Sequence, residues 1–255
     1  MFSWGRGRKL LYLSTALFFS VFAMILIAVV TWYERPNCFD NMKNQDEFGV
    51  DCGGSCAKVC TNEIAQISPD WVRFFEVKYG VYSVAVRAQN PNNLVAFSVP
   101  YRIKLYGSTG LLLGERDGEV YIPPNQAFGI FEGAISVPND KPARVTFEWR
   151  DKTNWVKNSA VNKPMVIKDV IRSFNGPGFP RVTALMENTS LQTVRNVRGV
   201  AIVYDLNGNA IAASKTIIDK VAGGGKAEMV FSWPVYFGQE ARVEILHWLL
   251  PMGEQ

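Results

Sequence analysis

The sequence predicts a mostly β protein, in which two tandem immunoglobulin-like β-sandwiches follow one transmembrane α-helix and a small disulfide-stapled segment. Three observations lead to this prediction. An uncharged apolar run lies near the N-terminus, and all four cysteines fall within the 23 residues from Cys38 to Cys60. The remaining chain is a series of short runs rich in β-branched and aromatic residues. Its 255 residues allow one or two folded domains besides the anchor.

The apolar run extends from Leu10 to Tyr33 and contains 24 residues without a charge. A helix of that length spans about 36 Å, more than the roughly 30 Å of a bilayer's hydrocarbon core. A cleaved signal peptide is the alternative, but its apolar region is shorter and ends in small residues. Here the run ends in Trp32 and Tyr33, so the sequence predicts a retained single-pass anchor in the cell membrane over residues 10–33.

The charges near the anchor predict its orientation. Arg6, Arg8 and Lys9 precede the run, so residues 1–9 are predicted to form a cytoplasmic tail and the domains after the helix to be extracytoplasmic. Without these three, 24 of the 27 basic residues remain against 23 acidic residues. A nearly neutral body lacks the basic surface of a nucleic-acid-binding protein. We therefore expect a lipid bilayer as a partner and no nucleic acid.

Residues 34–62 are predicted to form a cysteine-rich stalk. An even number of clustered cysteines outside the membrane indicates two disulfides in an oxidising compartment. Cys38, Cys52, Cys56 and Cys60 allow three pairings, and the sequence does not choose among them. Zinc and iron–sulfur sites usually show paired CxxC spacings, which this segment lacks.

The same segment carries the candidates for a metal site. Oxygen ligands for calcium are available from the following residues: Asp40, Asn44, Asp46, Glu47 and Asp51. Their spacing does not match an EF-hand loop, and solvated acidic turns are the favoured explanation. The prediction is therefore no cofactor, with calcium as the alternative.

The segment resembles a short motif of exported proteins, C-x-D-G-x-x-N-x-D-E-x-x-x-D-C-G-G-x-C-x-x-C. The matching residues include Cys38, Asp40, Asn44 and the run from Asp51 to Gly54. Asn41 replaces the motif's glycine, and three residues instead of two separate the last two cysteines. The resemblance implies export and no particular activity.

Beyond the stalk, the short runs are predicted to form a first sandwich over residues 68–150, a linker over 151–163 and a second sandwich over 164–251. The two sandwiches align at a constant offset of 98 residues, which places Val84 on Val182 and Asn90 on Asn188. A period near 100 with about seven short strands is typical of an immunoglobulin-like sandwich. The sequence therefore predicts a tandem duplication. It also favours a turn over a glycosylation site at Asn188, because the aligned Asn90 opens an NPNN turn.

Both halves resemble the FxLYD and late-embryogenesis-abundant-like sandwiches of bacterial and archaeal envelope proteins. The residues that carry the resemblance are Ile103–Tyr106 with Gly110, and Ala201–Asp205 with Gly208. Both copies lack the motif's phenylalanine, and the first has Gly107 in place of aspartate. Such domains are generally binding or structural modules, and the fold alone implies no particular activity.

Residues for catalysis are scarce, and we predict that the protein is not an enzyme. The single histidine, His247, lies in an apolar strand-like run where packing is the expected role. A carboxylate-based hydrolase would need two acidic side chains across a cleft. Glu115, Asp117 and Glu119 are the available group, but the sequence ERDGE predicts a solvated hairpin tip.

Trp155 is the aromatic residue with the clearest alternative roles. It lies in the polar linker, where it either packs at the domain junction or contacts a partner. The function predicted from the sequence is a membrane-anchored scaffold or interaction protein that binds another envelope protein through its sandwiches. A cell-wall or glycan-binding protein is the alternative.

Overall fold

The computed structural model describes residues 4–32, 37–44, 46–56, 58–151, 153–157, 165–173, 179–238, 240 and 242–249. It divides into two compact units, one up to Cys60 and one that begins at Thr61. Parts of the expected segments lie outside the described residues: 1–3 of the tail, Tyr33 of the anchor, 34–36, 45 and 57 of the stalk, 152 and 158–163 of the linker, and 164, 174–178, 239, 241, 250 and 251 of the second sandwich.

The first unit begins with a long helix, α1 (Trp4–Trp32). Its segment Arg8–Thr31 has a mean hydropathy of 2.6, and no part of it is buried by other residues. Leu, Ile, Phe and Ala predominate along it, and they are exposed on all sides of the helix. The helix is therefore long and apolar enough to cross a membrane, as the sequence predicted.

The cysteine-rich segment follows the helix in the same unit. Disulfides join Cys38 to Cys56 and Cys52 to Cys60, so the two bridges interlock in sequence. Gly49 and Cys52 form an isolated β-bridge, and backbone hydrogen bonds such as that from the Glu47 amide to the Asn44 carbonyl close local turns. Covalent bridges thus take the place of a hydrophobic core in this segment.

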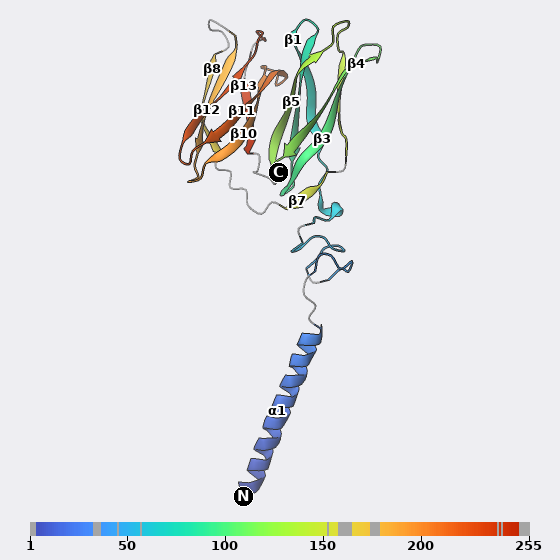
Figure 1. Ribbon diagram of the computed structural model, residues 1–255, viewed down its shortest axis with the longest axis vertical. Helices are drawn as coiled ribbons and strands as arrows, with labels where there is room; N and C mark the ends of the chain where they lie inside the picture. Colours follow the sequence, from blue (N-terminus) through green and yellow to red (C-terminus); the bar gives the residue numbers. More distant parts are fainter. Residues whose placement is uncertain are drawn as a thin grey trace. The chain divides into compact units, whose positions relative to one another are not determined.

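The second unit is built almost entirely of antiparallel strands (Figure 1). After the 3-10 turn Thr61–Glu63, the first half contains β1 (Pro69–Lys78), β2 (Val81–Asn90), β3 (Leu94–Tyr106), β4 (Leu112–Ile122), β5 (Gln126–Ser136), β6 (Arg144–Trp149) and β7 (Trp155–Lys157). The second half contains β8 (Met165–Ser173), β9 (Arg181–Asn188), β10 (Val194–Tyr204), β11 (Ala210–Val221), β12 (Lys226–Ser232) and β13 (Arg242–Leu249).

Each half consists of two sheets. In the first half the strand orders are β1-β2-β5 and β4-β3-β6, with β7 added beside β3. In the second half they are β12-β9-β8 and β11-β10-β13. Alternate residues of central strands, such as Val84 and Val86 of β2 or Val182 and Ala184 of β9, are buried between the two sheets of their half.

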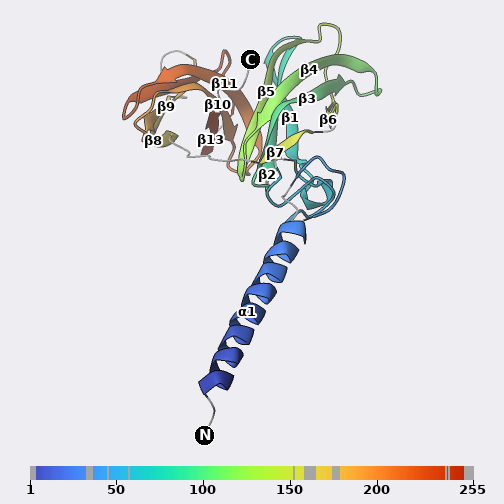
Figure 2. The same cartoon turned by 60° about the horizontal axis from the view of Figure 1, so that its bottom comes forward.

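The two halves also pack against each other, and we call this contact the junction. Val200, Ile202 and Leu246 of the sheet β11-β10-β13 belong to the same buried cluster as Val84 and the rest of the first half's core. The sheet β1-β2-β5 is therefore buried on both faces, by β4-β3-β6 on one side and by β11-β10-β13 on the other (Figure 2).

The same local features recur 98 residues apart. Strand register shifts occur between Pro69 and Trp71 in β1 and between Ile167 and Asp169 in β8. Gly110 and Gly208 both have positive φ, at 82° and 78°, in the turns that follow β3 and β10. The guanidinium groups of two arginines stack over tyrosine rings at matching positions, Arg144 over Tyr106 and Arg242 over Tyr204.

The expected hairpin tip at ERDGE is wrong. Residues Leu112–Ile122 form one continuous strand, β4, in which Asp117 pairs with Arg102 of β3. Gly118 suggested a turn, but it lies opposite Tyr101, and a Cβ at this glycine would overlap the Tyr101 phenol. Glycine is therefore present because an aromatic ring crosses the strand, and not because the chain reverses.

Candidate functional site

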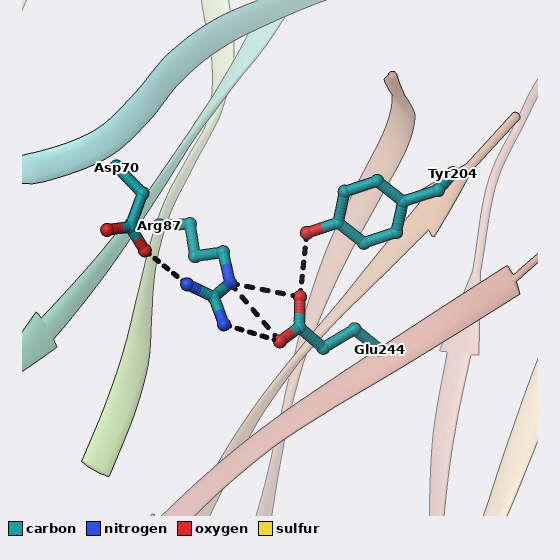
Figure 3. A network of polar contacts seen from close by, with 4 residues as sticks. All are labelled: Asp70, Arg87, Tyr204 and Glu244. Atoms are coloured by element: carbon teal, nitrogen blue, oxygen red, sulfur yellow. Dashed lines mark hydrogen bonds and ion pairs between the residues drawn. The ribbon is translucent and has the colours of Figure 1, made fainter. Parts of the chain in front are cut away.

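A connected group of four polar side chains, Asp70, Arg87, Tyr204 and Glu244, lies at the junction (Figure 3). Arg87 of β2 donates from Nη2 to Oε1 of Glu244 on β13 over 2.9 Å, and from Nε to Oε2 over 3.1 Å. Tyr204 of β10 donates its hydroxyl hydrogen to Oε2 of Glu244 over 2.7 Å. Arg87 also forms an ion pair with Asp70 of β1. One guanidinium thus joins two carboxylates from the two halves of the unit.

The pKa shifts of these residues are typical of a structural contact. Burial alone would raise the pKa of Glu244, but hydrogen bonds from Arg87 and Tyr204 outweigh it and lower this pKa below its usual range. Burial and the hydrogen bond to Glu244 raise the pKa of Tyr204 to about 12. The Glu244 hydrogen bond likewise raises the pKa of Arg87. A phenol with so high a pKa is a poor acid or base near neutral pH, so the group is suited to holding the halves together.

Apolar contacts surround the ion pairs. A Cβ on Gly129 of β5 would lie 3.0 Å from Val200 and 3.3 Å from Leu246, so the backbone of β5 approaches the second half closely. Trp71 and Tyr204 pack edge to face with ring centroids 6.3 Å apart. This combination of a small residue, aromatic rings and a paired charge is typical of a permanent interface.

Sequence reasoning missed the junction residues, although one signal was available. The run from Val81 to Ala88 in β2 is apolar or small at nearly every position, and only Arg87 is charged. A strand without alternation is typical of burial on both faces, which indicates a third layer beyond a single sandwich. The partner of Arg87 was not predictable, because Glu244 lies 157 residues away.

The calcium candidates lie in the first unit, and several of them accept hydrogen bonds from backbone amides of the same segment. Asp51 accepts hydrogen bonds from the amides of Asp40 and Asn41, and Oε2 of Glu47 accepts from the amides of Asn44 and Asp51. Glu47 and Asp51 are buried, with 5% and 8% of their surface exposed. These carboxylates take the place of regular backbone pairing in the loop.

The other calcium candidates are more exposed. Asp46 accepts a hydrogen bond from the Ser55 hydroxyl, and Asp40 accepts one from the Asn44 amide. Among the described residues, Cys38, Glu47 and Cys56 form the one group of three whose ligand atoms lie within 4.8 Å of one another. Cys38 and Cys56 are bonded to each other, so they offer no thiolate to a metal.

Trp155 lies in β7, where it pairs with Ala96 of β3 and packs on the first half's core. Part of the expected linker is thus a strand that extends the sheet β4-β3-β6. Trp149 lies in the same cluster and donates from its indole nitrogen to the Ile67 carbonyl over 3.2 Å. The contacts of Trp155 within the first half support a packing role.

The residues considered for catalysis are dispersed. The ring of His247 lies 3.2 Å from the carbonyl oxygen of Met165, between β13 and β8. Asp117 accepts two hydrogen bonds of 2.6 Å from Arg102, which lower its pKa and keep it ionised. A carboxylate with a lowered pKa is poorly suited to be the proton donor of a glycoside hydrolase.

Exposed apolar side chains occur on loops of the second half. Phe179, before β9, and Tyr236, between β12 and β13, have ring centroids 6.3 Å apart. They are 64% and 61% exposed, and Leu206 in the β10–β11 turn is 71% exposed. A pair of large exposed rings that contact each other forms an apolar patch suited to binding.

Comparisons with known proteins give little similarity. No family model matches the chain, and no curated protein matches it. Among solved structures, a transglutaminase from red sea bream matches with a TM-score of 0.23 and 11% sequence identity. The match covers 72% of this chain and 29% of the transglutaminase chain.

Proposed function

We propose that this chain is a single-pass membrane protein whose extracytoplasmic β unit binds another protein of the cell envelope. The apolar helix of 29 residues supports the anchor, and Arg6, Arg8 and Lys9 at its start support a cytoplasmic N-terminus. The two disulfides support an oxidising compartment for the rest of the chain. The proposal assigns no catalytic activity.

The four sheets are interpreted here as two sandwiches that arose by duplication. The buried amides of Asn90 and Asn188 support this interpretation, because they make the same contacts. Asn90 donates to the carbonyls of Leu94 and Pro123, and Asn188 donates to those at the positions 98 residues later, Gln192 and Val221. FxLYD-like domains, which both halves resemble in sequence, are generally binding or structural modules.

The observation that carries the binding function is the exposed pair Phe179 and Tyr236. Both rings lie on connections between strands, where binding residues commonly occur on a rigid scaffold. The junction provides that rigidity, because it holds the second half to the first through buried contacts. Cell-wall glycan is the second candidate ligand, since aromatic rings of this kind can also stack on sugar rings.

The test is photo-cross-linking of the full-length chain in its own cells. A photoreactive amino acid replaces Phe179, and a matched control replaces Leu191, which is 99% exposed on the β9–β10 turn. We expect one or two envelope proteins to be captured from position 179 and not from position 191, with capture reduced severalfold by Tyr236→Ser. Capture of glycan fragments alone would favour the second candidate. Equal capture from both positions would contradict the proposed surface.

A further inference from the structure

The junction covers one face of the sheet β1-β2-β5, and among the described residues of this unit the matching face of the second half is uncovered. In β9, Val182, Ala184 and Met186 point into the second core, so Thr183 and Leu185 lie on the outer face of β12-β9-β8. Ile171 of β8 pairs with Thr183 and is 62% exposed. The second half therefore presents to solvent the face that the first half buries.

Within the part of this unit that the structure describes, the first half leaves the complementary face uncovered. The outer face of β4-β3-β6 corresponds to the face of β11-β10-β13 that forms the other side of the junction. It carries ion pairs between strands, with Lys104 and Glu148 2.8 Å apart and Arg102 bound to Asp117. Leu111, in the turn before β4, is 65% exposed. Two kinds of sheet face meet at the junction. Each chain thus has a second, uncovered face of each kind.

We propose that these two faces bind each other between two copies of the chain, in the arrangement of the internal junction. The outer face of β12-β9-β8 in one copy takes the place of β1-β2-β5, and the outer face of β4-β3-β6 in the next copy takes the place of β11-β10-β13. The inference rests on the duplication proposed above. It does not involve the Phe179 and Tyr236 surface, so either can fail without the other.

The first support is that apolar residues replace both members of a polar contact of the junction at the corresponding positions. At the junction Arg73 of β1 donates to the Asn209 side chain over 3.1 Å. The residue 98 positions after Arg73 is Ile171, and the residue 98 positions before Asn209 is Leu111. These are two strongly exposed apolar side chains of the unit. Contact between copies would bury both of them, which would account for their exposure in a single chain.

The second support is the joint loss of the central ion pair. Arg87 corresponds to Leu185, and Glu244 corresponds to Thr146 of β6. Had only one charge been replaced, the other would be buried without a partner between copies, at a large energetic cost. Because both are replaced by uncharged residues, the contact between copies would bury no unpaired charge at these two positions.

The third support is a new pair of opposite charges. At the junction Gly129 lies against Val200. Glu228 of β12 pairs with Leu185 as Gly129 of β5 pairs with Arg87, so Glu228 is the counterpart of Gly129. The counterpart of Val200 is Arg102. The transposed contact therefore brings the Glu228 carboxylate to the Arg102 guanidinium, and this pair attracts.

Two transposed contacts are unfavourable. Gly129 also lies against Leu246, whose counterpart is Glu148, so the Glu228 carboxylate would lie near a second carboxylate. At the junction the Lys215 side chain donates to the main-chain oxygen of Phe131. The counterpart of Lys215 is Asp117, and the residue at the register position of Phe131 is Val230. Between copies the Asp117 carboxylate would therefore face the Val230 carbonyl, and two acceptors repel each other. The association is therefore weaker than the covalently linked junction. Since the two faces differ, the contact is head-to-tail and leaves one face uncovered at each end of a stack.

Site-directed cross-linking of the detergent-solubilised full chain tests the proposal. All four cysteines form disulfides, so an introduced cysteine is the single free thiol of each variant. We expect a short bismaleimide to join Ile171→Cys chains to Leu111→Cys chains when the two are mixed, and to join neither variant to itself. Ile217→Cys mixed with Leu111→Cys is the matched control, because Ile217 is 54% exposed on β11.

A charge exchange provides a second measurement that does not depend on cysteine. In sedimentation of the full chain, Ile171→Glu should weaken self-association at least tenfold, and Leu111→Lys in the same chain should restore it. Ile217→Glu should have no effect. A wild-type chain that is monomeric at every concentration, or equal cross-linking through position 217, would overturn the proposal. Cross-linking of Ile171→Cys to itself would overturn the head-to-tail geometry.

Discussion

Arg87 and Glu244 form a two-point ion pair between β2 and β13, although 157 residues separate them in the sequence. Their side chains are 24% and 19% exposed, so the pair is largely shielded from water. A shielded guanidinium–carboxylate pair is stronger and more specific than a surface ion pair. It therefore fixes how the second half lies on the first.

Replacement of Arg87 by methionine should destabilise the unit. The substitution keeps most of the apolar volume but leaves the Glu244 carboxylate partly buried without its cation. We expect the free energy of unfolding to fall by about 2 kcal/mol, as measured by urea denaturation of the full chain in detergent. Arg102→Met on the outer face of β3 is the matched control and should cost clearly less. Equal losses would show that the junction pair behaves as a surface pair.

The junction should also weaken in acid. The pKa of Glu244 is lowered in the folded protein from its ordinary value of 4.5, so folding favours the ionised form. This stabilisation is complete above the ordinary pKa and is lost as the pH falls through the lowered one. Glu244→Gln should therefore be less stable than wild type at pH 7, and the difference should disappear in strong acid.

A second variant isolates this effect from other carboxylates, since Asp117 and Glu148 also have lowered pKa values. In the Arg87→Met background, Glu244→Gln should change the acid dependence little. Thermal melts of the four proteins across the acid range measure the difference. A Glu244→Gln effect that persists unchanged in strong acid would refute the assigned cause.

The parts of the fold that depend on local pattern were predictable from the sequence. The apolar helix, the β-rich body and the presence of disulfides follow from composition and periodicity. The pairing of Cys38 with Cys56 was not predictable, because it depends on how the loop folds. The continuity of β4 was missed because Gly118 has the same composition signal whether a turn or a crossing aromatic ring requires it.

The junction was missed for a different reason. Period-two alternation shows which face of a strand is buried, but it does not identify what covers that face. Val200 and Ile202 alternate with Ala201 and Val203, and all four are buried. From sequence alone this is an apolar run, and the division of its residues between two different cores emerges only in three dimensions.

The paired asparagines give a test of the duplication. Asn90 and Asn188 are fully buried, and their amides donate to carbonyls that cap two turns. Asn90→Ala and Asn188→Ala should each lower the free energy of unfolding by about 2–3 kcal/mol, because those carbonyls lose their donors. The control is Asn207→Ala, at an exposed position.

Similar losses at Asn90 and Asn188 would support equivalent roles, whereas a loss confined to one of them would contradict the duplication.

The burial of Asn188 predicts that this residue is not glycosylated in a host that modifies the sequon Asn188-Thr189-Ser190. Intact mass of the secreted or solubilised chain checks this expectation.

Calcium should have no effect on the cysteine-rich segment. An ion would need oxygen atoms that converge, yet Asp51 directs its carboxylate to the amides of Asp40 and Asn41, and Glu47 directs Oε2 to two other amides. We therefore expect the same melting temperature for the full chain in millimolar calcium and in a chelator. Asp51→Asn should lower it equally in both, because an amide accepts those hydrogen bonds more weakly than a carboxylate. A melting temperature that rises with calcium in the wild type, and not in Asp51→Asn, would establish a calcium site there.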